Sequence, residues 1–118
     1  MRGFEELFRT EYARLVRCLR SVDDNADDVV QESFARAYVR WRWVKELDDP
    51  AGWVRRDAVT RLRAHRLREL TALALFYGGE YSITEIAYAM NISDAQVFER
   101  LRRGRERVRT QLAVTADV

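Results

Sequence analysis

Apolar residues recur at spacings of three and four along most of this chain, which is the period of an amphipathic helix. One apolar stripe covers residues 4–21, and a second covers residues 26–44 after a short polar turn. A third helix is predicted from Pro50 to about Arg68, because Asp49 can cap it and proline suits the first helical position. The first half of the chain is therefore predicted to contain three helices.

Two capping boxes mark helix starts in the second half, after a short apolar helix that a pair of glycines ends. The two boxes are Ser82–Glu85 and Ser93–Gln96. In each, the serine hydroxyl can accept a hydrogen bond from the backbone N–H three residues later, and the Glu or Gln side chain can accept one from the backbone N–H of the serine. Asn91 lies between them and tolerates the left-handed conformation of a tight turn. We expect an all-α fold of about six helices, over residues 4–21, 26–44, 50–68, 70–77, 83–90 and 94–112, with a frayed tail.

The last two predicted helices and their turn have the layout of a helix-turn-helix. Its small core is expected to contain Ile86, Ala87, Met90, Ile92, Val97 and Leu101. In such a unit, early residues of the second helix enter the major groove and later arginines meet phosphates. The candidate DNA contacts are therefore Gln96, Phe98, Glu99, Arg100, Arg102 and Arg103. The alternative is an ordinary helical hairpin with a solvated arginine face.

Charge is unevenly distributed along the chain. The net charge of +2 divides into −2 over residues 1–52, with nine basic and eleven acidic residues, and +4 over residues 53–118, with twelve and eight. All the basic residues except Lys45 are arginines. The guanidinium of arginine makes bidentate hydrogen bonds to phosphates and to guanine edges. This asymmetry predicts a protein-facing front half and a nucleic-acid-facing back half.

The third predicted helix combines a tryptophan with several arginines. Such a tryptophan can be a stacking platform over a phosphate-binding track, or it can simply belong to the core. On the first interpretation, further candidate DNA contacts are Trp53, Arg55, Arg56, Arg61 and Arg63.

Composition argues against several classes of function. The single histidine, His65, and the single cysteine, Cys18, do not make a metal cluster, and no catalytic constellation or phosphate-cradling loop is present. We therefore expect no enzyme activity, no cofactor and no metal. No apolar run approaches the roughly 20 residues that span a bilayer, so we expect no membrane association and a cytoplasmic location. Cys18 is expected to be a packed thiol.

The segment Ala26–Tyr38 has an apolar face and a polar face, and Asp24 or Asn25 can cap it. Its sequence Asp-Asp-Val-Val-Gln-Glu-Ser-Phe resembles the helix with which bacterial sigma factors, especially the extracytoplasmic-function group, grip the clamp of RNA polymerase. The resemblance implies contacts with core RNA polymerase through Asp27, Asp28, Gln31, Glu32 and Arg36. A merely solvated polar face is the alternative.

The resemblance extends over nearly the whole chain. The helix-turn-helix looks like the domain with which this group reads the −35 promoter element, although Phe98 and Gln96 stand where the group often has a basic residue and threonine. Asp49–Val54 resembles the start of its −10 reading helix. The resemblance implies promoter DNA as a partner, and an anti-sigma or other regulatory protein as a further one.

The junction between the two expected modules, residues 1–68 and 69–118, is very short. Three residues span at most about 11 Å, whereas one turn of DNA is about 34 Å long. The modules are therefore expected to pack on each other rather than straddle two promoter elements. Two other functions stay open. One is a helix-turn-helix regulator that works without polymerase, and the other is a sigma-derived adapter that binds a protein through the predicted helix 26–44 or through Phe98 and Trp43.

Overall fold

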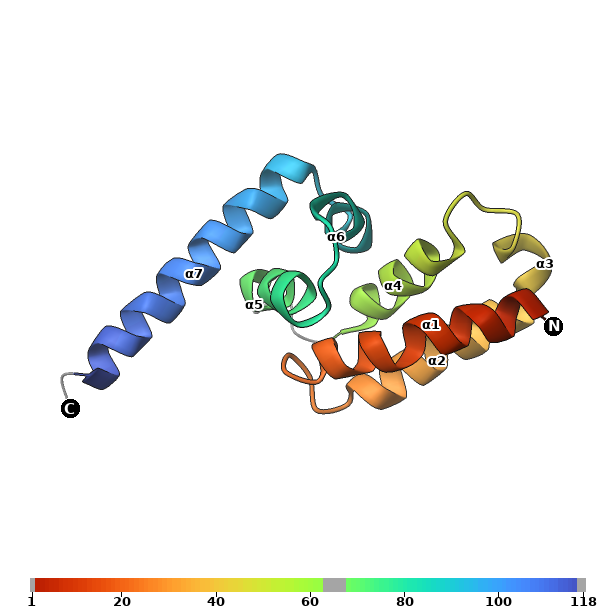
Figure 1. Cartoon of the computed structure of the whole chain (residues 1–118), viewed down its shortest axis with the longest axis horizontal. Coiled ribbons are helices and arrows are strands. Elements are labelled where there is room, and N and C mark those ends of the chain that lie inside the picture. The colour runs from red at the N-terminus through yellow and green to blue at the C-terminus, as the bar shows by residue number, and fades with distance from the viewer. Residues whose placement is uncertain (1, 63–67, 117–118) are drawn as a thin grey trace.

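The structure is a computed structural model that describes residues 2–62 and 68–116. Its elements are α1 (Arg2–Leu19), α2 (Ala26–Val39), α3 (Trp41–Val44), α4 (Pro50–Arg61), α5 (Arg68–Leu73), the π-helical segment η2 (Ala74–Gly78), α6 (Ile83–Met90) and α7 (Asp94–Ala116) (Figure 1). All regular structure in the described residues is helical, which confirms the predicted all-α class. None of the described helices is both long and apolar enough to cross a membrane.

The helices α1 and α2 form an antiparallel hairpin (Figure 1). Its centre is fully buried at Leu15 and Val30, as the apolar stripes predict. Toward the N-terminus of α1 the hairpin is aromatic, because Phe34 meets the rings of Phe4 and Phe8 edge-on at centroid distances of 6.3 and 5.3 Å. Burial of these two stripes against each other contributes hydrophobic stabilisation to the first half.

The stretch predicted as one helix over residues 26–44 is two elements, so that prediction was wrong. Arg40 has φ −103° and ψ 21°, which ends α2, and α3 is a single turn whose Val44 is fully buried. Phe4, the first apolar residue of α1, contacts Tyr38 at 5.3 Å between centroids. Phe4 also contacts Trp41 at 5.6 Å between centroids, so α3 packs on the start of α1 after the break.

The structure confirms the predicted side-chain cap of α4 and contradicts that of α2. Asp49 caps α4, since its Oδ1 accepts from the backbone N–H of Gly52 at 3.0 Å. Asn25 is the N-cap residue of α2 but makes no side-chain cap bond. Instead the backbone N–H of Asn25 donates to Asp23 at 2.8 Å. The side chain of Asn25 therefore contributes little to starting α2.

The helix α4 ends earlier than predicted. Leu62 follows Arg61 in an extended conformation, with ψ 132°, and its side chain is 5% exposed. The predicted end at Arg68 was therefore wrong, because Arg68 starts the next helix. The candidate DNA contact Arg63 and the lone His65 lie outside the described residues.

The predicted short apolar helix is α5 followed by the wider turn η2, and it stops at Gly79 as expected. A side chain at Gly79 could not be accommodated, because a Cβ there would lie 2.5 Å from the ring of Tyr81. Cys18 packs beside Gly78 and is 3% exposed, which confirms the packed thiol. Burial raises the pKa of Cys18 to about 12.

The helix α7 is long and crosses α5 at Gly104. A Cβ at Gly104 would lie 2.8 Å from Leu73 Cδ1 and 3.3 Å from the carbonyl oxygen of Glu69, so the close approach of the two helices depends on this glycine. Beyond the crossing, residues 111–115 are exposed yet still helical. The helix therefore continues past the end predicted near residue 112, and residues 117–118 of the tail predicted to fray lie outside the described residues.

The second half of the chain packs on the first half. The helix α4 lies against α6, and α1 contacts η2 (Figure 1). The molecule measures 55 × 28 × 21 Å, and the C-terminal part of α7 projects at the end opposite the N-terminus. This packing agrees with what the short junction predicts.

Candidate nucleic-acid interface

The segment predicted as a helix-turn-helix forms α6, a short turn and α7, and both of its predicted capping boxes are present. Ser82 Oγ accepts from the Glu85 backbone N–H at 3.1 Å, and Glu85 Oε1 accepts from the Ser82 backbone N–H at 2.9 Å. Ser93 and Gln96 make the same exchange at 3.1 and 2.9 Å. Each box satisfies backbone N–H groups at the start of its helix. Such a cap contributes about 0.5–2 kcal/mol to the stability of the fold.

The turn between α6 and α7 depends on Asn91. This residue has φ 57° and ψ 48°, the left-handed conformation expected for it. Its backbone N–H donates to the end of α6, and the N–H of Ile92 donates to the Ala87 carbonyl at 3.0 Å. The chain therefore reverses within a few residues, which sets the angle at which α7 leaves α6.

The core of this unit contains the residues predicted for it. Ile86, Ala87, Val97 and Leu101 are buried, and Met90 and Ile92 pack against them partly buried. The spacing of apolar residues was therefore sufficient to identify this core.

The outer face of α7 is open in its first turns. Phe98 is 60% exposed, and the side chains of Arg102 and Arg103 are each 62% exposed. Gln96 is also exposed, but its side chain is occupied by the second capping box. An aromatic ring and two arginines on one exposed helical face are groups that a groove or a phosphate backbone can contact.

Glu99 neutralises part of this basic face. Its carboxylate accepts from Arg102 at 2.6 and 3.0 Å and from Arg103 at 2.9 Å. These bonds, led by those from Arg102, lower the pKa of Glu99 to about 2. Arg102 and Arg103 are therefore paired with Glu99 in the free protein, and its carboxylate competes with any phosphate they bind.

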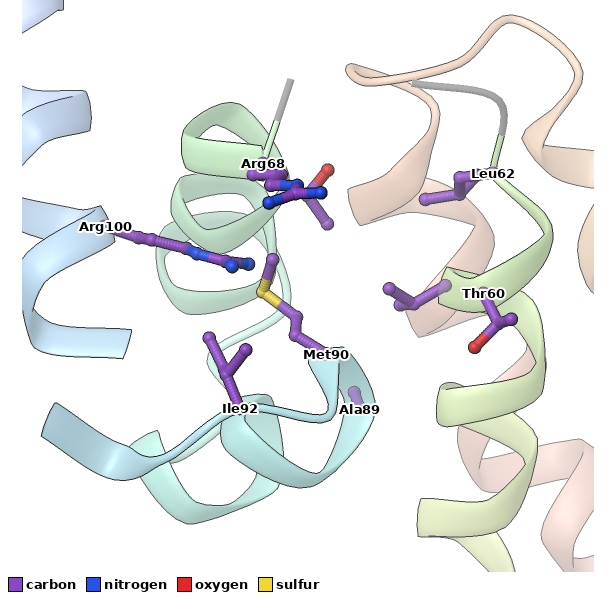
Figure 2. A pocket seen from close by; sticks show the side chains of 9 residues that line it. Thr60, Leu62, Arg68, Ala89, Met90, Ile92 and Arg100 are labelled. Atoms are coloured by element: carbon purple, nitrogen blue, oxygen red, sulfur yellow. The ribbon is translucent and has the colours of Figure 1, made fainter. Parts of the chain in front are cut away.

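Arg100 does not share this face. It is half-buried, and its side chain reaches from α7 toward Met90 in the space between the helices (Figure 2). Burial, and then the charge of Arg68, lower the pKa of Arg100. The predicted α7 contacts thus divide into an exposed group and one inward-facing arginine.

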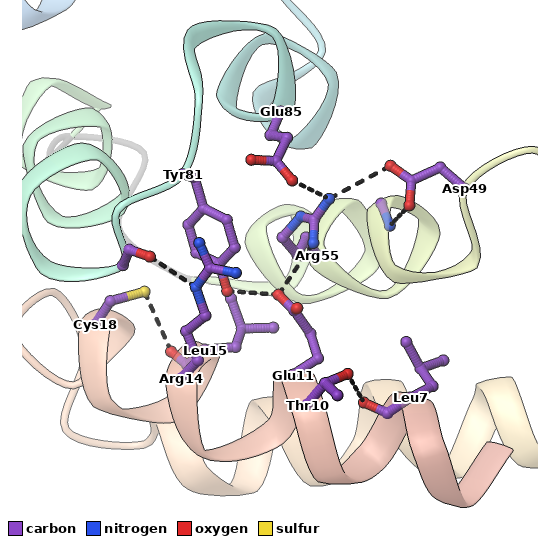
Figure 3. A network of polar contacts seen from close by, with 12 residues as sticks. Leu7, Thr10, Glu11, Arg14, Leu15, Cys18, Asp49, Arg55, Tyr81 and Glu85 are labelled. Atoms are coloured by element: carbon purple, nitrogen blue, oxygen red, sulfur yellow. Dashed lines mark hydrogen bonds and ion pairs between the residues drawn. The ribbon is translucent and has the colours of Figure 1, made fainter. Parts of the chain in front are cut away.

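Arg55 lies in an interior network rather than on a DNA track. The residue is 3% exposed, and its guanidinium meets Glu11 at 3.1 Å, Asp49 at 3.3 Å and Glu85 at 3.2 Å (Figure 3). Tyr81 donates to the same Glu11 oxygen at 2.5 Å. The prediction that Arg55 meets DNA is corrected on this ground, since α1, α4 and α6 enclose it.

The other candidates on α4 are also engaged within the protein. Arg56 donates to Asn91 Oδ1 at 2.7 Å, and its guanidinium lies over the ring of Tyr88, 5.1 Å from the centroid. Arg61 pairs with Asp57 at 3.0 Å and with Glu32 at 3.3 Å. The helix expected to read DNA therefore uses these two arginines for contacts inside the molecule.

Of the two roles considered for Trp53, a stacking platform and a core residue, its position fits the core role. It is partly buried against the core, and its ring meets Trp43 edge-on at 6.1 Å. Trp43 itself is 55% exposed. A stacking platform would need the face of Trp53 to be free, so the core role fits it better.

The polar face of α2 is open. Asp28, Gln31 and Glu32 are exposed, Arg36 is half-buried, and Asp27 accepts from the Tyr12 hydroxyl at 2.5 Å. That hydrogen bond is the first cause of a lowered pKa of Asp27. The five residues predicted for polymerase thus share one helix, and Tyr12 of α1 and Arg61 of α4 contact the edges of the face they form, at Asp27 and Glu32.

Sequence reasoning missed Glu11, Tyr81 and Arg14 as a group. Arg14 donates to the carbonyl of Gly79 at 2.7 Å and lies 4.0 Å from the Tyr81 centroid (Figure 3). Glu11 and Tyr81 are 70 positions apart in the chain, so no local spacing links them. The one available signal was that Glu11 falls beside the apolar stripe of its helix.

Comparison of the chain with protein-family models, with curated proteins and with solved structures gives no match.

Proposed function

We propose that this protein is a compact sigma-like transcription factor that binds DNA through α7 and core RNA polymerase through α2. The observation that carries the proposal is the capped α6–Asn91–α7 unit, whose early α7 face is exposed and basic. The resemblance of the α2 sequence to the clamp-binding helix of extracytoplasmic-function sigma factors adds the polymerase. Neither the α2 face nor the α7 face covers the other, so one molecule can use both.

The proposed DNA binding through α7 is tested by measuring the affinity for a DNA duplex over a series of salt concentrations. The variant Arg102→Gln/Arg103→Gln should bind more weakly, and its plot of log K against log salt should flatten by about 0.9 for each phosphate that is no longer neutralised. The matched control is Arg9→Gln/Arg17→Gln, which removes the same charge from two exposed positions on α1. Equal effects of the two double variants, or a flat salt response of the wild type, would contradict the proposal.

The polymerase arm is tested by charge reversal on α2. Asp28→Lys/Glu32→Lys should abolish co-purification with core polymerase while leaving the circular dichroism spectrum unchanged, since both side chains are exposed. The control Glu5→Lys/Glu6→Lys reverses two exposed charges on α1. Wild-type recovery of polymerase by the α2 variant would rule this arm out.

A regulator that works without polymerase is the second candidate, and the packing of α4 favours it. Arg55 and Arg56 tie α4 to α6 and its turn, so α4 is not free to reach a second promoter element. Gel shifts with and without polymerase separate the two candidates. Tight, sequence-selective binding by the protein alone would favour the regulator. A stable complex with another protein, and no DNA binding at low salt, would instead favour an adapter that uses the exposed Phe98.

A further inference from the structure

A pocket of about 360 Å³ lies where α4, α5, α6 and α7 meet (Figure 2). Its volume is within the range of small-molecule sites in proteins. Leu62, Met90 and Ile92 supply apolar lining, and Arg68 and Arg100 supply the charged lining. The pocket is distinct from the exposed face of α7 and from the polar face of α2.

Two arginines from different helices reach this pocket. Arg100 extends across from α7, and Arg68 projects from the start of α5 (Figure 2). They are close enough for the charge of Arg68 to lower the pKa of Arg100, after the larger effect of burial. Both guanidinium groups stay protonated at neutral pH, so folding brings two like charges together.

Neither arginine has an acidic partner in the described residues. Glu69 is the one acid whose charge acts on Arg100, and its carboxylate pairs with Arg107 at 2.9 Å. The five residues of the sequence between Leu62 and Arg68 contain no Asp or Glu. An anion in the pocket would therefore meet two guanidinium groups that no carboxylate of the described chain occupies.

We propose that this pocket binds a small organic phosphate, with the phosphate group on Arg68 and Arg100 and an apolar or planar body against Met90 and Ile92. A phosphate monoester carries a charge of about −1.5 to −2 at neutral pH, which matches two cations better than a carboxylate does. Its oxygens suit the forked donors of arginine. The inference goes beyond the proposed function, since this binding needs neither DNA nor polymerase.

Thermal unfolding at constant ionic strength tests the site, with adenosine monophosphate, inorganic phosphate and adenosine as probes. Adenosine monophosphate should raise Tm with the logarithm of its concentration above Kd, by roughly 10 °C at about a hundred times Kd. Inorganic phosphate should act only at higher concentration, and adenosine should have no effect. Arg100→Gln and Arg68→Gln should each abolish the response, whereas Arg9→Gln, which removes an exposed charge on α1, should keep it.

The variants also separate a site from a general effect of anions. Without ligand, Arg100→Gln and Arg68→Gln should unfold no earlier than the wild type, because each removes the repulsion. An equal Tm rise in all variants would overturn the proposal. So would the absence of any rise together with weaker duplex binding by Arg100→Gln, which would assign the arginine pair to the DNA backbone. Phosphate and adenosine monophosphate acting at equal concentration would overturn the apolar half of the site.

Discussion

Replacing Arg55 by methionine should destabilise this protein more than any substitution on its exposed surface. Methionine keeps much of the length of the arginine stem but removes the guanidinium that Glu11, Asp49 and Glu85 share. The Glu11 side chain is 5% exposed, so it would be left buried with the Tyr81 hydroxyl but without its cation. The substitution therefore weakens the interface between the two halves of the molecule.

The expected magnitude follows from burial. Removing one partner of a buried ion pair costs about 3–5 kcal/mol, whereas an exposed pair contributes about 0–1 kcal/mol. Asp49 and Glu85 are 56% and 37% exposed, so the pair with Glu11 dominates. Arg55 Nε is buried with no hydrogen-bond partner in the described structure, which puts the expectation near the lower end, at about 3 kcal/mol. Total stabilities of small domains are about 5–15 kcal/mol, so this decrease is large.

Urea unfolding followed by far-ultraviolet circular dichroism measures the effect. Arg61→Met is the matched control, since Arg61 is on the same helix and also pairs with two acids but has a side chain 27% exposed. It should cost under about 1 kcal/mol. The double variant Arg55→Met/Glu11→Gln should cost less than the sum of its single changes, because it leaves no buried charge. A decrease below about 1 kcal/mol for Arg55→Met, or additive single changes, would refute the reasoning.

Further predictions concern four single positions. Asn91→Ala should cost about 1–2 kcal/mol in urea unfolding, because alanine is strained at φ 57°, whereas Asn91→Gly should keep the turn and cost less. Gly104→Ala should destabilise the protein by about 1–3 kcal/mol, because the new Cβ would meet Leu73, and this outweighs the better helix propensity of alanine. A gain in Tm would contradict this and would show that α5 shifts at little cost. Glu99→Gln should strengthen non-specific DNA binding by freeing two arginines, and unchanged affinity in a duplex titration would disprove this. The pKa of Glu99 is lowered from 4.5 to about 2, so the stability from its ion pairs is present above pH 4.5 and is lost as the pH falls through 2. The difference in Tm between the wild type and Glu99→Gln should therefore vanish near pH 2. Cys18 should react with a thiol reagent only after unfolding, because burial raises its pKa to about 12, and rapid labelling of the folded protein would contradict its packing.

Local chemistry determined much of the helix-turn-helix. Both serine capping boxes and the left-handed Asn91 depend on groups within four residues of one another, so the sequence alone could locate them. The apolar periodicity also identified the helices and most of the core, because a stripe must be buried wherever its helix lies. Even the packing of the two halves followed from the short junction.

Tertiary structure decided what the sequence left open. Residues 26–44 form one apolar stripe in the sequence, but the helix breaks at Arg40, and Trp41 packs on Phe4 after the break. Arg55 and Arg102 are both arginines on helices, and only the fold makes one an interior ion-pair partner and the other a surface cation. The physical reason is that a local pattern fixes which way a side chain points from its own helix. Whether water, a carboxylate or another helix meets it depends on residues far away in the chain.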